Sequence, residues 1–221
     1  LEASEKGKGR TGMAIQLILL AAGFSRRFGE NKLLVMLQGK PLYLHMLENL
    51  VELKNKRKDI VSLTVVTRYQ EIAGEAEKLG VTVAWNNHSE DGISSSLQTG
   101  LAAVSIREKQ EQDKQFYCFF VGDQPYMKLE TIEEFLDRFA QSNKGIGCMS
   151  REGRSGNPVI FSGKYGDELM ALAGDVGGKQ VLRKHEDDVF YYEVHEKQQL
   201  LDIDRPEHMD CYKKLSLIDK K

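Results

Sequence analysis

The sequence has little of what marks several large protein classes. Its three cysteines are far apart and form no CxxC pair, so their spacing gives no sign of a structural zinc site, and we expect reduced thiols. No stretch approaches the roughly 18 to 20 apolar residues needed to span a bilayer. Lys and Arg number 31 against 33 Asp and Glu, a formal net charge of -2. No overall basic field therefore favours nucleic acid or an anionic membrane as a partner.

Two familiar nucleotide-binding motifs are also missing. No GxGxxG follows the first apolar run, which excludes the dinucleotide-binding fingerprint. The nearest approach to a Walker A loop is AGDVGGKQ (173–180). It has Ala173 at the first glycine position and Gln180 where Ser or Thr is required. We therefore expect neither a P-loop NTPase nor a standard dehydrogenase.

A length of 221 residues suits one domain with a substantial core. Residues 1–12 are polar and rich in Gly and Lys, without the apolar centre of a signal peptide. We expect residues 1–12 to be a flexible leader or a remnant added for expression, with Met13 as a plausible start, and a single domain over 13–221. These features favour a protein of the cytoplasm.

Short runs of Ile, Val and Leu alternate with amphipathic stretches, which predicts an α/β fold of βαβ units around a mainly parallel sheet. The expected strands are 14–20, 61–67, 81–85, 116–121, 145–150, 157–161 and 189–193. The expected helices are 41–54, 70–79, 93–108, 129–141, 163–172, 176–184 and 206–215.

The loop after the first expected strand combines glycines with cations. It carries, in chain order, Gly23, Ser25, Arg26, Arg27, Gly29 and Lys32. Glycines let backbone N–H groups turn toward a phosphate, Arg grips phosphate oxygens bidentately, and Lys supplies a movable charge. The loop therefore predicts an anion site, although turn glycines and solvated cations would leave the same pattern.

The apolar run FYCFFVG (116–122) predicts a central strand that is covered on both faces. Asp123 then lies at the carboxyl end of a strand, where open α/β sheets bind their ligands. Mg²⁺ prefers oxygen ligands and usually takes one or two carboxylates together with substrate phosphates. Asp123 is thus a candidate metal ligand, and a cap for the helix after Pro125 is the alternative.

These segments resemble a known enzyme family. LLAAGFSRRFGENK (19–32) is similar to the signature LAAGxSxRMGxxK of the nucleotidyltransferases related to MobA and to the sugar-nucleotide pyrophosphorylases, with Phe28 where Met is usual. VGDQP (121–125) resembles their magnesium-holding GDxP motif, and LDIDRPEH (201–208) resembles DIDTPED. GISSSLQTGL (92–101) matches their GxxxSLxxGL pattern. The resemblance covers the chain from Met13 onward, with the motifs in the family's order.

The resemblance implies a Rossmann-like three-layer sandwich of the nucleotide-diphospho-sugar transferase (GT-A-like) type. It implies a nucleotide-binding half at about 13–125 and an acceptor-binding half at about 126–221. Mg²⁺ is the implied cofactor, held by Asp123 and Asp204, with Asp202 as the alternative to Asp204. The implied catalytic residues are Arg27, Lys32 and Asp123. The implied nucleotide contacts are Leu20, Ala21, Ala22, Gly23, Ser25, Arg26, Arg27, Gly29, Lys32, Gly92, Ser96 and Asp123.

Two further segments are similar to the family branch that acts on the molybdenum cofactor, the molybdenum cofactor cytidylyltransferases (MocA/PucB-like). RSGNPVIF (154–161) resembles RGHPVLF, and AGDVGGKQVL (173–182) resembles GDxGARxLL. The implied acceptor contacts are Gln124, Gly156, Asn157, Pro158, Asp175, Gly177 and Gly178. Asn157 stands where His is usual, and Lys179 where Arg is usual, which leaves the pterin contacts open. A tight turn is the other reading of Gly177 and Gly178.

The LAAG of the first loop, with Ala22, is typical of family members that use CTP. The resemblance thus implies CTP and molybdopterin cofactor as substrates, and a molybdenum hydroxylase such as xanthine dehydrogenase as a client. We expect neither nucleic acid nor a membrane as a partner. Two alternatives stay open. One is a sugar- or polyol-phosphate nucleotidyltransferase, and the other is a non-catalytic protein that delivers the cofactor.

Overall fold

The computed structural model describes residues 12–23, 31–104 and 114–204. Its strands are β1 (Ala14–Ala21), β2 (Met36–Leu37), β3 (Lys40–Pro41), β4 (Ile60–Thr67), β5 (Thr82–Trp85), β6 (Gln115–Val121), β7 (Ile146–Arg151), β8 (Arg154–Ser162) and β9 (Val189–Glu193). Its α-helices are α1 (Leu42–Lys56), α2 (Gln70–Lys78), α3 (Ile93–Ala103), α4 (Leu129–Ser142), α5 (Gly166–Met170) and α6 (Lys179–Lys184). The short 3₁₀ turns are η1 (Lys32–Leu34), η2 (Ser89–Asp91), η4 (Gly163–Tyr165), η5 (Glu186–Asp188) and η6 (Lys197–Leu200).

Seven strands form one sheet in the order β5-β4-β1-β6-β8-β7-β9. All neighbouring pairs are parallel except those made by β8, which runs antiparallel to β6 and β7. The prediction of a mainly parallel sheet is confirmed. The antiparallel strand was not expected, and it follows from the two-residue turn between β7 and β8. Glu152 and Gly153 both adopt positive φ there, as the turn of a tight hairpin requires.

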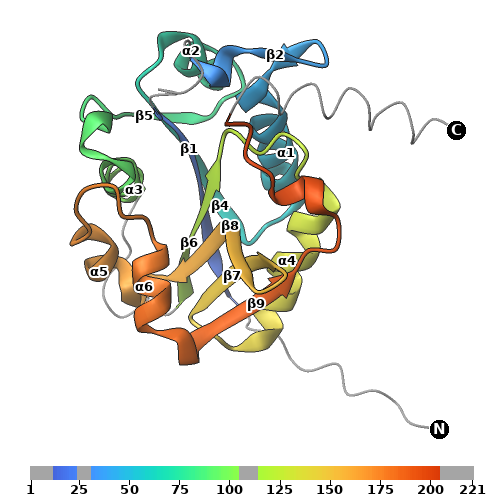
Figure 1. The fold of residues 1–221 in the computed structure, drawn as a ribbon, viewed down its shortest axis with the longest axis vertical. Helices are drawn as coiled ribbons and strands as arrows, with labels where there is room; N and C mark the ends of the chain where they lie inside the picture. Colours follow the sequence, from blue (N-terminus) through green and yellow to red (C-terminus); the bar gives the residue numbers. More distant parts are fainter. Residues whose placement is uncertain (1–11, 24–30, 105–113, 205–221) are drawn as a thin grey trace, which may run out of the picture.

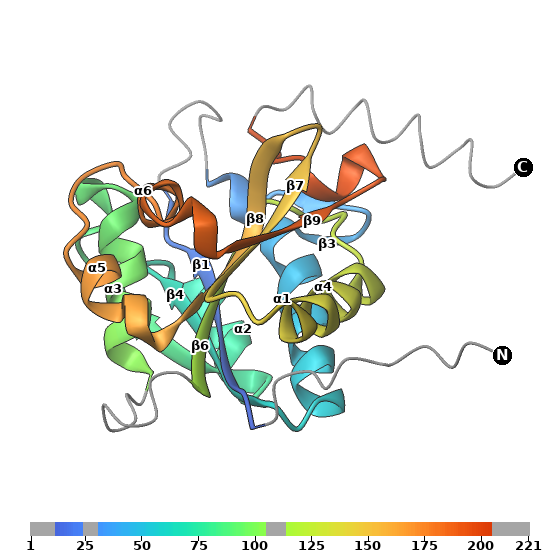
Figure 2. The same cartoon turned by 90° about the horizontal axis from the view of Figure 1, so that it is seen from below.

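Helices cover both faces of this sheet, which makes a three-layer sandwich as predicted (Figures 1 and 2). Alternate residues of β1 face opposite layers, as the pleat of a strand demands. Ile15, Leu17 and Leu19 share one buried cluster with side chains of α1, α2 and α4. Ile18 shares the other cluster with side chains of α3, α5 and α6. Because both faces are buried, β1 is apolar except for the buried Gln16.

Helix α3 approaches β1 closely because Gly100 has no side chain. A β-carbon at Gly100 would lie 2.6 Å from Cγ2 of Ile18, a buried and branched side chain that has little room to move. This contact sets how closely the last turn of α3 packs against β1.

We expect Gly100→Ala to lower the free energy of unfolding by about 1 to 2 kcal/mol through overpacking, although Ala is the better helix former. Gly74→Ala in α2 is the matched control, because nothing lies within 4 Å of a β-carbon there. That change should leave stability equal or raise it by up to about 1 kcal/mol. Urea unfolding of the two variants measures the difference, and equal midpoints would contradict the close packing.

Most of the expected helices and strands are observed within a few residues of their predicted bounds. The segment expected as one helix over 163–172 is instead η4 followed by α5, and α6 begins only at Lys179. The short β2–β3 hairpin was not expected. The helix expected over 206–215 and the last residues of the one over 93–108 lie outside the described residues. Within the part of the chain described, no helix combines the length and apolar character needed to cross a membrane.

Two of the three cysteines belong to the described residues, and both are buried free thiols. Cys118 faces the first buried cluster from β6, and Cys148 faces the second from β7. Burial raises the pKa of both thiols, which disfavours the reactive thiolate form. They act as packing residues of the sheet. Cys211 lies outside the described residues.

Candidate active site

The candidate site begins where two parallel strands end side by side. Leu20 of β1 pairs with Val121 of β6, and the amide of Gly122 donates to the carbonyl of Leu20 at 3.1 Å. Gly23 and Asp123 therefore follow at the same edge of the sheet. Both line a cavity of about 760 Å³, a size within the usual range for small-molecule sites.

Nine of the sequence-predicted site residues line this main cavity. They are Leu20, Ala22, Gly23, Lys32, Gly92, Ser96, Asp123, Asp175 and Asp204. Ala21 does not line it, because the residue is buried and its carbonyl accepts from the hydroxyl of Thr67 at 3.0 Å. The predicted residues Ser25, Arg26, Arg27 and Gly29 lie outside the described residues.

Lys32 lies between two carboxylates in this cavity. Its Nζ donates to Oδ2 of Asp123 at 2.7 Å and to Oδ1 of Asp204 at 2.6 Å. The side chains of Lys32 and Asp123 are 14% and 19% exposed, so their charges are only partly hydrated, whereas Asp204 is 45% exposed. Three segments far apart in the sequence thus place one cation and two anions together.

Local structure explains how these three side chains meet. Asn31 caps η1 by accepting from the amide of Leu33 at 3.1 Å, which positions Lys32 at the start of that turn. On the other side, the amide of Ile203 donates to the carbonyl of Asp123 at 3.0 Å. Ile203 is fully buried in a small cluster with Leu37 of β2 and Leu42, the residue that follows β3. The unexpected hairpin therefore anchors the segment that carries Asp204.

The carboxylates decide the charge of Lys32. Burial alone would lower the pKa of the ammonium, but the charges and hydrogen bonds of Asp123 and Asp204 outweigh burial, so the pKa is raised above its usual value. Lys32 is therefore cationic at neutral pH.

Asp202 differs from Asp204, because its Oδ1 accepts from the side-chain amide of Gln124 at 2.9 Å and it does not line the cavity. Partial burial and the nearby negative charge of Asp123 raise the pKa of Asp202 to about 6. The residue as a whole is nevertheless exposed to solvent.

The donor set fits a hard divalent cation. Oδ1 of Asp123 is buried and has no hydrogen-bond partner among the described residues, so one oxygen of the carboxylate remains available. Asp123 and Asp204 already lie close enough to bind one ammonium between them. No group of three or more His, Cys, Asp or Glu suited to a metal occurs in the described part of the chain. An arrangement in which two carboxylates share a metal ion with substrate phosphates is typical of Mg²⁺.

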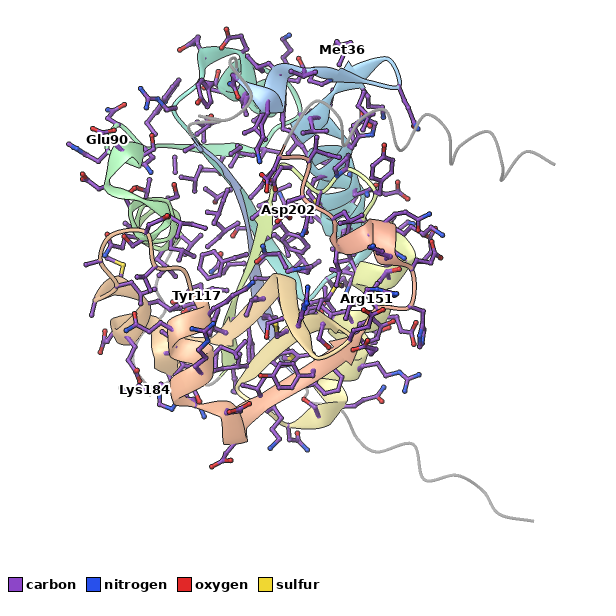
Figure 3. All side chains as sticks on the ribbon, viewed as in Figure 1. Met36, Glu90, Tyr117, Arg151, Lys184 and Asp202 are labelled. Carbon is purple, nitrogen blue, oxygen red and sulfur yellow. The ribbon has the colours of Figure 1, made fainter. Side chains whose placement is uncertain are left out.

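The negative charge of the main cavity also favours a bound cation. Its described lining includes the acidic residues Glu90, Asp91, Asp123, Asp175 and Asp204, with Lys32 as the cation among the described lining residues. Glu90 is exposed and lies on the connection from β5 to α3, at the edge of the molecule in this view (Figure 3). A triphosphate is strongly anionic, so it could enter only with more positive charge. A divalent ion and the arginines of the loop after β1 are the candidate sources.

The amino end of α3 forms another wall of the main cavity. Asn86 follows β5 and is buried, and its Nδ2 donates to the hydroxyls of Ser95 and Ser96 at 3.0 and 2.9 Å. Its Oδ1 accepts from the amide of His88 at 2.9 Å. Because Ser96 already accepts from Asn86, its O–H is oriented to donate elsewhere, and Ser96 lines the cavity. This wall offers a hydroxyl donor and backbone amides at a helix start.

A smaller cavity of about 210 Å³ adjoins the main one. Leu20, Ile93 and Val121 line both. The other lining residues of the smaller cavity are Leu97, Phe119, Asn157, Val159, Phe161, Gly177, Gly178 and Lys179. Its walls are mostly apolar, with the amide of Asn157 and the cation of Lys179 as polar groups.

Three predicted acceptor residues, Asn157, Gly177 and Gly178, thus lie together, while Asp175 faces the main cavity. Gly156, Pro158 and Gln124 line neither cavity. The side chain of Gln124 is buried and holds Asp202 instead.

Residues 17–189 match the family described as the MobA-like NTP transferase domain, a match that spans most of the chain. The chain belongs to this family. It is a nucleotidyltransferase domain of the MobA-like kind. Lys32 and Asp123 lie within the matched residues, and Asp204 lies after them.

Comparisons with individual proteins agree with this family. Over 202 residues the chain is 23% identical to Purine catabolism protein PucB of Bacillus subtilis, covering 89% of this chain and 95% of that protein. Over 136 residues it is 28% identical to the probable molybdenum cofactor guanylyltransferase of Thermococcus gammatolerans, covering 60% of each. The solved structure of Rv0371c from Mycobacterium tuberculosis in complex with manganese has a TM-score of 0.67 at 22% identity, covering 92% of this chain and 98% of that one. At this identity, the structural likeness concerns the fold.

Sequence reasoning missed several residues that shape this MobA-like site. Thr67 ends β4 and Tyr69 follows it, and their hydroxyls donate to the carbonyls of Ala21 and Gly23 at 3.0 and 2.9 Å. Asn86 follows β5 and organises the serines of α3. The rule that singled out Asp123, namely that ligands bind beyond the carboxyl ends of parallel strands, applies equally to these strands.

Proposed function

We propose that this protein transfers CMP from CTP to the terminal phosphate of molybdopterin, with release of pyrophosphate. The observation that carries the proposal is the convergence of Gly23, Lys32, Asp123 and Asp204 in one cavity that continues into a second, largely apolar cavity. The first has the donors and the acidic pair expected for a triphosphate with its metal. The second offers room for the acceptor beside it.

In this mechanism, an oxygen of the acceptor's terminal phosphate attacks the α-phosphorus of CTP. The bond from that phosphorus to the oxygen bridging to the β-phosphate breaks, and pyrophosphate leaves with the electron pair. The acceptor phosphate is already anionic, so no general base is needed. Lys32 and Arg27 stabilise the negative charge that accumulates on the departing pyrophosphate, and the cavity walls align the two phosphates.

Asp123 and Asp204 are the residues that would hold Mg²⁺. Oδ1 of Asp123 has no partner among the described residues, which supports its assignment as a ligand. When bound, the ion supplies Lewis-acid neutralisation of phosphate oxygens. The manganese complex of the similarly folded Rv0371c supports a divalent cation in general, and the choice of Mg²⁺ is part of our proposal.

The proposed nucleotide contacts are the cavity-lining residues named above together with Ser25, Arg26, Arg27 and Gly29 of the loop after β1. Ala22 supports CTP, since LAAG is typical of CTP-using members. Three relatives are named probable molybdenum cofactor guanylyltransferases, so the base is a point for experiment. We propose residues 13–125 as the nucleotide-binding half and 126–221 as the acceptor-binding half. A cytoplasmic location and a molybdenum hydroxylase client such as xanthine dehydrogenase complete the proposal.

The smaller cavity supports a flat, partly apolar acceptor. Phe119, Phe161 and Val159 present carbon surface, whereas a sugar ring would need many more hydrogen-bonding partners. Asn157 and Lys179 at this cavity are suited to polar ring atoms and to phosphate. These contacts favour a pterin over a sugar or polyol phosphate, which is the second candidate acceptor.

Incubation with Mg²⁺, molybdopterin cofactor and each of the four ribonucleoside triphosphates tests the proposal. We expect pyrophosphate release and a cytosine dinucleotide of the cofactor with CTP, at a rate at least about tenfold above GTP. Parallel reactions with sugar phosphates and polyol phosphates provide the acceptor control. Turnover with those acceptors alone would favour the second candidate. Binding of CTP and cofactor without any pyrophosphate release would favour a non-catalytic delivery role.

A further inference from the structure

Helix α3 touches both cavities and also holds the segment between α5 and α6. In Figures 1 and 2 this segment, residues 171–178, lies beside α3 at the same end of the molecule. Its downstream residues face the site. Asp175 lines the main cavity, and Gly177, Gly178 and Lys179 line the smaller one. The position of this segment therefore defines one wall of the proposed acceptor site.

Ser94 makes the central contact. Its hydroxyl donates to the carbonyl of Gly174 at 2.7 Å, and its backbone amide points to the same oxygen at 3.4 Å. Ser94 is 3% exposed, so the hydrogen bond is shielded from water. Gly92 permits the approach, because a β-carbon there would lie 2.5 Å from the carbonyl atoms of Gly174. The backbones at Gly92 and Gly174 therefore lie too close together for any side chain at position 92.

Gln98, one turn further along α3, makes a second contact. Its Nε2 donates to the carbonyls of Met170 and Leu172, both at 2.8 Å. Met170 ends α5, where a helix leaves carbonyls without partners of its own, and Leu172 follows two residues later. Gln98 thus fixes the point at which the segment leaves α5, and Ser94 fixes the point at which it turns toward the cavities.

Residues 171–178 contain no helix or strand to hold them. Among the described residues, the hydrogen bond accepted by the Gly174 carbonyl comes from α3 and from no neighbour in the segment. Ser94 and Gln98 do not line either cavity. Their influence on a substrate must therefore act through the segment they hold.

We propose that Ser94 and Gln98 are positioning residues that set the acceptor wall of the site through the 171–178 segment, which couples the nucleotide-binding helix to the acceptor subsite. This inference rests on the proposed function for the identity of the two substrates. Loss of either side-chain contact weakens acceptor binding, while the nucleotide contacts of α3 stay in place.

The test compares Ser94→Ala and Gln98→Met with the wild-type protein. Each change removes a donor at nearly constant volume. We expect the KM for the acceptor to rise at least about fivefold in each variant, with the KM for the nucleotide within about twofold of wild type. Thr99→Val is the matched control, because it removes a hydroxyl bonded within α3, to the carbonyl of Ser95 at 2.8 Å, and leaves the segment untouched. The control should keep both KM values.

Hydrogen–deuterium exchange without substrates provides a readout that does not depend on activity. We expect faster amide exchange over 171–178 in Ser94→Ala and unchanged exchange in Thr99→Val. If the wild-type protein turns over but both KM values change equally in Ser94→Ala, or neither changes, the inference is overturned. If the wild-type protein transfers no nucleotide, the proposed function fails. The exchange data then decide alone, and wild-type exchange over 171–178 in Ser94→Ala overturns the inference.

Discussion

Asp123→Asn should lower kcat at least about 100-fold at saturating CTP, acceptor and Mg²⁺, a loss on the scale of other essential electrostatic groups. Asn keeps the shape of the side chain but removes the negative charge that would hold the cation. The fold should survive, because the hydrogen bond that anchors the Asp204 segment uses the backbone carbonyl of residue 123. Release of pyrophosphate measures the effect, and circular dichroism with a thermal melt checks the fold.

Variants of Asp204 and Asp202 test which of the two carboxylates is the second metal ligand. Asp204→Asn should lower kcat/KM by about tenfold or more and raise the Mg²⁺ concentration needed for half-maximal rate, because Asp204 lines the cavity and faces Asp123 across Lys32. Asp202→Asn should stay within about threefold of wild type, because Asp202 bonds Gln124 outside the cavity lining. The reverse pattern would assign the second ligand to Asp202.

The sheet and the place of Asp123 were predictable because they depend on short-range patterns. A short continuous apolar run rich in aromatic residues, such as 116–121, is typical of a strand buried on both faces, and its abrupt end places the next polar residue at the sheet edge. Since β1 and β6 are parallel and ladder-paired up to Leu20 and Val121, their following residues must meet. The motifs then supplied the chemistry through resemblance.

Other features depend on contacts that no local pattern encodes. The pairing of Lys32 with Asp204 joins residues 172 apart in the sequence, and it relies on Ile203 packing against the β2–β3 region. The hairpin that reverses β8 turns at Glu152-Gly153, which is not the Asn-Gly or Asp-Gly pair that predicts such a turn. Gln124 lies inside the GDxP-like motif, directly after Asp123, where the resemblance predicts an acceptor contact, but in the folded chain its side-chain amide binds Asp202.

Lys32→Met should lower kcat/KM by at least about 100-fold, with a higher KM for the nucleotide, because the cation in the described lining of the main cavity is lost while the aliphatic stem is kept. The same change should also lower the unfolding temperature of the metal-free protein. Asp123 and Asp204 would then face each other without Lys32 between them, and a partly buried carboxylate that loses its partner is costly.

Divalent ions should reverse that loss of stability. Because a cation that binds only the folded state stabilises it, added Mg²⁺ or Mn²⁺ should raise the unfolding temperature of Lys32→Met by more than it raises that of wild type. Lys40→Met is the matched control. Lys40 pairs with Glu48 on the surface, where both side chains are at least 40% exposed, so its loss should change stability and activity little. Equal metal responses in the two lysine variants would show that the carboxylates beside Lys32 do not bind the ion, even if activity were lost.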